Sequence, residues 1–171
     1  MKKIFAALFA AVIALCFCAC GSSSESSAQS SQGSAEAAVS AKPLKEIFED
    51  VKTQVGIENL TELSNVRTLD RYYGITEDKV SEFAGGNNSS GVSQEEIVLI
   101  KAVDDNAAAA VEASLNDRYN SKLEQSRNYN PEQAAIIEKC KVQRDGLYVS
   151  MIVSENADRI TDIYRTEAGL K

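Results

Sequence analysis

The strongest constraint on the fold is a near-continuous apolar run, Ile97-Val98-Leu99-Ile100, inside residues 96–103. Its β-branched residues and near-continuous apolar character favour a central strand of a sheet. Asp104-Asp105-Asn106 follows the run and supplies a helix N-cap. A long helix is then predicted over residues 107–127, because Val111, Leu115, Tyr119 and Leu123 recur every four residues.

A second strong signal is Asp145-Gly146, which separates residues 141–144 from residues 147–153. Both flanking runs are rich in residues that favour strands, and Asp-Gly between such runs is typical of a β-hairpin. A helix should precede this hairpin over residues 130–139, with Asn130 as its N-cap, Pro131 at its first position and Gln133 bonding back to the cap. Tyr129 and Ala134 occupy the two positions of a hydrophobic staple.

Two further helices are predicted at the ends of this region. Residues 43–55 begin with Pro43, carry one apolar stripe and stop at Gly56. A last helix starts at Ser154 or Asn156 and places Ala157, Ile160, Ile163 and Tyr164 on one face.

The segment between residues 57 and 91 has weaker signals. Residues 69–75 look like a short helical turn closed by Gly74, and Thr76 opens another short turn. The glycine- and asparagine-rich residues 85–91 are predicted to form a loop. The whole pattern predicts an α+β domain: a small antiparallel sheet with helices packed mainly on one face.

The N-terminus has the three regions of a bacterial export signal. Met1-Lys2-Lys3 is basic, the following run to Ala19 is apolar, and Gly21-Ser22 comes after Cys20. The apolar run is shorter than the ~20 residues of a membrane-spanning helix. Phe17-Cys18-Ala19-Cys20 is similar to a lipobox, so we expect cleavage before Cys20 and a diacylglyceryl, palmitate-type anchor on its sulfur. The alternative is an ordinary signal that leaves Cys20 as a free thiol.

These features divide the 171 residues into three parts: signal peptide 1–19, lipidated Cys20 with a Ser/Ala-rich tether over 20–42, and one domain over 43–171. The tether has too little apolar surface to fold by itself. The formal net charge is −7, and loss of Lys2 and Lys3 makes it more negative. An acidic domain without a basic stripe argues against nucleic acid as a partner.

Catalytic and metal-binding patterns are missing from the sequence. It contains no histidine, which excludes the Ser-His-Asp and Cys-His arrangements and the commonest zinc ligand. Cys140 is the cysteine left over after lipidation, and we expect it to be buried. The pairs Glu95-Glu96 and Asp104-Asp105 could hold carboxylate chemistry, but adjacent strand residues point to opposite faces. We therefore predict no catalytic residue, no metal and no cofactor.

Tyr72 and Tyr73 are the candidate binding aromatics. They cannot both point inward from one short turn, so we expect one of them to be exposed to a sugar or peptide partner. Tyr119, Tyr148 and Tyr164 lie on apolar faces and are expected to pack in the core.

Four segments carry a family resemblance: Tyr72-Tyr73-Gly74-Ile75, residues 95–102, the long acidic helix, and residues 146–149 leading into residues 154–158. In their order and spacing they resemble a family of small lipoproteins of unknown function from Firmicutes, mainly Clostridia. The resemblance covers residues 43–167 and implies a lipobox and a low-complexity tether. Residues 85–91 differ from the more apolar segment usual in the family. The resemblance implies no activity.

The sequence thus predicts a lipoprotein held at the extracytoplasmic face of the cell membrane through Cys20. Its domain is expected to be a binding module for a protein, peptide or cell-wall ligand rather than an enzyme. Two alternatives stay open: a cryptic carboxylate- or metal-dependent enzyme acting on cell-wall material, and an assembly factor that acts through its sheet edge.

Overall fold

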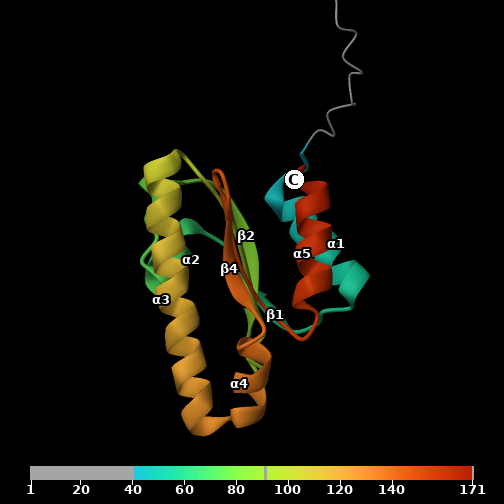
Figure 1. The fold of residues 1–171 in the computed structure, drawn as a ribbon. Helices are drawn as coiled ribbons and strands as arrows, with labels where there is room; N and C mark the ends of the chain where they lie inside the picture. Colours follow the sequence, from blue (N-terminus) through green and yellow to red (C-terminus); the bar gives the residue numbers. More distant parts are fainter. Residues whose placement is uncertain (1–40, 91, 171) are drawn as a thin grey trace, which may run out of the picture. The chain divides into compact units, whose positions relative to one another are not determined.

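The computed structural model describes residues 41–90 and 92–170. The predicted signal, Cys20 and most of the tether lie outside the described residues. Figure 1 shows the order of elements: α1 (Leu44–Val55), β1 (Leu60–Glu62), α2 (Val66–Tyr73), the 3-10 turn η1 (Glu77–Lys79), β2 (Val80–Asn88), β3 (Glu96–Ala102), α3 (Asp105–Tyr129), α4 (Pro131–Ile137), β4 (Lys141–Asp145), β5 (Tyr148–Val153) and α5 (Ala157–Glu167).

The sheet has five strands in the order β1-β2-β3-β5-β4, and every neighbouring pair is antiparallel. The apolar run forms β3, the central strand, as predicted. The Asp-Gly signal also forms the predicted hairpin, in which β4 and β5 turn at Gly146 and Leu147.

Helices cover both faces of this sheet. Val98, Ile100 and Ala102 of β3 pack toward α2 and α3, whereas Ile97 and Leu99 pack toward α1 and α5. Figure 1 shows α2 and α3 on one side of the strands and α1 and α5 on the other. The predicted α+β class is confirmed. The expectation that the helices gather mainly on one face is wrong, because β3 has apolar side chains in both of its alternating positions.

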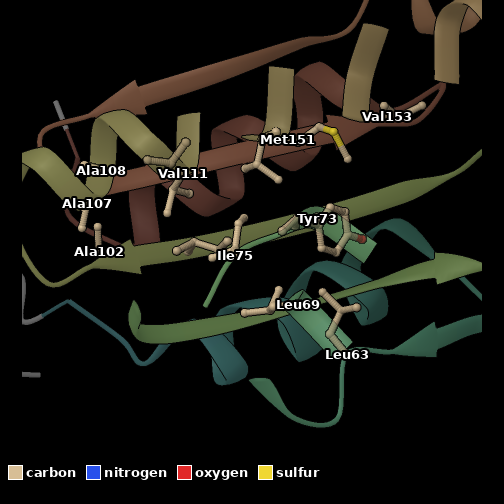
Figure 2. Close-up of a cluster of buried hydrophobic side chains, with 14 of the residues drawn as sticks. Leu63, Leu69, Tyr73, Ile75, Ala102, Ala107, Ala108, Val111, Met151 and Val153 are labelled. Atoms are coloured by element: carbon tan, nitrogen blue, oxygen red, sulfur yellow. The ribbon is translucent and has the colours of Figure 1, made fainter. Parts of the chain in front are cut away.

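The larger apolar cluster lies between the sheet and α2 and α3. Figure 2 shows Tyr73 and Ile75 projecting toward the same space as Met151 of β5. Ala107, Ala108 and Val111 of α3 complete this layer, and the small alanine side chains allow α3 to approach the strands closely. This packing holds α2 and α3 against the sheet.

Side-chain caps form at the predicted ends of two helices, and two other expectations for helix ends are not met. The Asp104 and Asn130 side chains cap α3 and α4 by accepting from the N–H groups of Ala107 and Gln133. Pro43 is the N-cap of α1, one residue before the predicted position. The predicted staple at Tyr129 does not form, because 84% of that residue is exposed.

The predicted loop over residues 85–91 is wrong for its first half. Gly85, Gly86 and Asn87 belong to β2, which pairs with both β3 and β1. A Cβ on Gly85 would lie 2.1 Å from the carbonyl oxygen of Ile97, and one on Gly86 would lie 3.0 Å from that of Thr61. The close approach of neighbouring backbones inside the sheet therefore requires these glycines. A glycine-rich sequence by itself does not distinguish such a strand from a turn.

Candidate functional site

A cleft lies at the end of the sheet where β3 begins and β5 ends. Four separate segments line it: residues 55–58 after α1, residues 93–95 before β3, Gln133 and Ile136 of α4, and residues 153–156 after β5. Its volume is about 270 Å³. We call this feature the sheet-end cleft.

Carboxylates dominate the charge of the sheet-end cleft. Glu58, Glu95 and Glu155 line it, and no lysine or arginine is among its lining residues. A neighbouring depression shares Ile136, Ser154 and Glu155 with the cleft and is also lined by Lys139 and Asp158. The cleft itself therefore favours cationic and hydrogen-bond-donating groups.

Glu95 is held in a fixed position on the wall of the cleft. Its Oε1 accepts a hydrogen bond of 2.6 Å from the Ser154 hydroxyl, and its main-chain N–H donates to Ser93 Oγ at 3.1 Å. Ser154 Oγ in turn accepts from the Asn156 N–H. The second carboxylate oxygen of Glu95 has no hydrogen-bond partner among the described residues.

The adjacent residue, Glu96, is fully buried on the opposite face of the sheet. Its Oε1 accepts from the Tyr73 hydroxyl at 2.8 Å and from Arg118 Nε at 3.0 Å. Its Oε2 lies 2.9 Å from both Arg118 Nη2 and Lys122 Nζ. We call these four side chains the Glu96 network. It joins α2, β3 and α3, and it confirms that Glu95 and Glu96 do not share a site.

The Glu96 network also supports the wall of the sheet-end cleft. Lys122 Nζ donates to the carbonyl oxygen and to the side-chain oxygen of Gln94, at 3.0 and 3.1 Å. The Gln94 N–H donates to Gln133 Oε1 at 2.8 Å. Gln133 was predicted to bond back to its own helix cap, but it fastens α4 to the loop before β3 instead.

The proton affinities in the Glu96 network follow from this packing. Burial alone would raise the pKa of Glu96, but the hydrogen bond from Arg118 and the charge on Lys122 outweigh it and hold that pKa below its usual value. Burial, together with the nearby Glu96 carboxylate, raises the pKa of the Tyr73 hydroxyl. Glu96 is thus a carboxylate and Tyr73 a neutral hydrogen-bond donor at neutral pH.

The two candidate aromatics have different environments. Tyr73 is only 6% exposed and belongs to the Glu96 network, so it is the buried one of the two tyrosines. Tyr72 is 47% exposed, with the Arg71 guanidinium 5.8 Å from its ring centre. Tyr72 is not among the residues that line the cleft.

Cys140 is buried, as predicted, and its Sγ lies 3.3 Å from the carbonyl oxygen of Ile136. Burial raises the pKa of this thiol, which disfavours the reactive thiolate. Within residues 41–90 and 92–170, no group of three or more cysteine or carboxylate side chains is placed to hold a metal ion. No helix in the same described residues is long and apolar enough to cross a bilayer.

Sequence reasoning missed the sheet-end cleft because its four segments are distant along the chain. Glu58 and Glu155 lie nearly a hundred residues apart, in segments without a motif. The one local signal is the run of polar residues Ser154-Glu155-Asn156 directly after a buried strand, and this run is equally typical of a helix start.

Comparison with known proteins gives one match. A family model described as "Domain of unknown function (DUF4358)" matches residues 53–154. This range contains the Glu96 network and all the segments of the cleft apart from Glu155 and Asn156. No curated protein and no solved structure matches the chain.

Proposed function

The chain belongs to the DUF4358 family, and we propose that it is a lipid-anchored binding module whose ligand occupies the sheet-end cleft. The observation that carries this proposal is the cleft itself, with Glu58, Glu95 and Glu155 on its walls and no cation among its lining residues. A protein, peptide or cell-wall component with amino or guanidinium groups is the matching ligand class.

The proposed location at the cell membrane follows from the N-terminal sequence. A lipid on Cys20 would hold the protein at the extracytoplasmic face of the cell membrane, as in the small lipoproteins of Firmicutes that the chain resembles. Two acyl chains are sufficient for stable anchoring, whereas one gives only reversible binding. This assignment rests on the lipobox-like residues 17–20 and on the short apolar run before them.

The cleft is distant from the first described residues. The described chain begins beside the end of α5, where the Lys42 N–H donates to the carbonyl oxygen of Glu167. Helix α1 then runs for 12 residues, about 18 Å, to the cleft at Val55. The cleft therefore lies at the opposite end of α1 from Lys42, which is near the start of the described chain.

A carboxylate-dependent hydrolase is the second candidate, because several carboxylates line one cleft. We favour binding because Glu95, the best-positioned of the three, accepts a hydrogen bond from Ser154 rather than facing a second carboxylate. Incubating the protein with purified cell wall and measuring released reducing ends and amino groups separates the candidates. The binding proposal predicts no release above that of a heat-denatured control.

Binding is tested directly with a defined probe. We expect a synthetic Lys-Gly repeat peptide to bind residues 21–171 in calorimetry, and an acidic Glu-Gly peptide not to bind. The variant Glu58→Gln/Glu95→Gln/Glu155→Gln should lose at least tenfold in affinity. Because the protein is acidic overall, the control neutralises three exposed carboxylates elsewhere, Glu46, Glu77 and Glu124. Equal losses in both variants would show that net charge, not the cleft, binds the peptide.

A further inference from the structure

A second feature, independent of the cleft, is the free edge of β4. Asp145 and Tyr148 flank the two-residue turn of the hairpin and face each other as a hydrogen-bonded pair. Since hydrogen-bonded and non-hydrogen-bonded pairs alternate, Gln143 and Lys141 also bond to β5. The main-chain N–H and C=O groups of Val142 and Arg144 therefore point away from the sheet.

These outward groups have no hydrogen-bond partner among the described residues. Strand β4 is the last in the order β1-β2-β3-β5-β4, and α3 and α5 pack on the faces of the sheet rather than along this edge. Val142 and Arg144 are both half-buried, so the edge is accessible from the side. An unpaired edge of this kind is a template for another strand.

The charges along β4 are self-complementary in one register. If a second β4 runs antiparallel about a two-fold axis at Gln143, then Val142 faces Arg144 of the second copy as a hydrogen-bonded pair. The same register places Lys141 opposite Asp145 of the second copy. Lys141 is exposed and Asp145 already accepts from Arg165, so each Asp145 would lie between two cations.

From this complementarity we propose that two copies of the chain associate through β4 and form one continuous ten-stranded sheet. Two hydrogen-bonded pairs and two Lys141–Asp145 contacts hold the strands together across the axis. A membrane anchor favours such pairing, because it confines both copies to one surface and raises their effective concentration.

The proposed pairing can be tested by cross-linking, because the two-fold axis brings Gln143 of one copy opposite Gln143 of the other. In a non-hydrogen-bonded antiparallel pair the Cα atoms are about 4.5 Å apart, which suits a disulfide. The full chain carrying Gln143→Cys is expressed in membranes, treated with an oxidising catalyst and run on a non-reducing gel. Thr61→Cys, on the opposite edge strand β1, is the matched control.

We expect Gln143→Cys to give a reducible band at twice the monomer mass and Thr61→Cys to give none. Adding Lys141→Asp, which would put two carboxylates opposite each other, should lower the dimer yield at least tenfold. Equal yields from Gln143→Cys and Thr61→Cys, a yield insensitive to Lys141→Asp, or an adduct with a different protein would each overturn the proposal. The cleft variants should leave the yield unchanged, so failure here leaves the ligand proposal standing.

Discussion

At the residue scale, Glu96 has the most consequential environment in the domain. A fully buried carboxylate meets two cations and a tyrosine hydroxyl, and every contact lies at or below 3.0 Å. A buried ion network is not automatically stabilising, but removal of one member leaves the others with unpaired charge. Glu96 therefore determines how firmly α2 and α3 are held to the start of β3.

We predict that Glu96→Ala lowers the free energy of unfolding by about 3 kcal/mol, because Arg118 and Lys122 lose their shared carboxylate. Urea denaturation followed by circular dichroism measures this change. The half-buried neighbour Glu95 is the control, and Glu95→Ala should cost less than about 1 kcal/mol. A loss for Glu96→Ala no larger than that of the control would contradict a central structural role for the Glu96 network.

The contribution of Glu96 to the free energy of unfolding should also depend on pH. Since the pKa of Glu96 is lowered in the folded state, its contribution is fully present above the ordinary value of 4.5. The contribution is lost as the pH falls through the lowered folded-state pKa. The stability difference between the protein and Glu96→Gln should thus be constant near neutral pH and shrink in acid.

The sequence predicted part of this chemistry. The opposite orientations of Glu95 and Glu96 followed from the alternation of side chains along a strand. The partners of Glu96 could not be predicted, because Tyr73, Arg118 and Lys122 lie 22 to 26 positions away in the sequence and meet it only when α2 and α3 pack on the sheet. Long-range packing, not local pattern, also decided which of Tyr72 and Tyr73 is buried.

At the scale of elements, β2 shows how tertiary contacts override local signals. Its glycines and asparagines are typical of a turn, yet the strand pairs on both sides. By contrast, β3, the β4–β5 hairpin and the caps of α3 and α4 were all predicted, since each depends on residues that are neighbours in sequence.

Gly85→Ala should destabilise the domain by at least about 2 kcal/mol, because its Cβ would overlap the Ile97 carbonyl oxygen across the β2–β3 ladder. Gly56→Ala is the matched control. Gly56 has a φ of 73° at the end of α1 but no atom within 4 Å of an added Cβ, so only the backbone conformation is penalised, by about 1 kcal/mol. Equal effects in denaturant titrations would mean that β2 and β3 do not approach as closely as described.

At the scale of the whole molecule, the first described residues, the cleft and the β4 edge occupy different places. The chain emerges beside the end of α5, the cleft lies at the far end of α1, and the free edge runs along β4. A ligand and a second copy could therefore bind to the protein at the same time.

The anchor is tested by substitution at its single attachment atom. Cys20→Ser should release the protein from the membrane fraction into the medium, because the thioether to the lipid cannot form. Cys140→Ser, which alters only a buried thiol, should leave the protein in the membrane fraction. Retention of Cys20→Ser in membranes would refute the lipoprotein assignment.

The central claim is that the sheet-end cleft is the binding site, and an NMR titration of residues 21–171 with the Lys-Gly peptide tests it most directly. We predict that the perturbed amide signals are those of residues 56–58, 93–95 and 154–156, with Gln133 and Ile136 of α4. The signals around the exposed Tyr72 on α2 should stay in place. Perturbation centred on α2 or the β4 edge, with the cleft unchanged, would contradict the account.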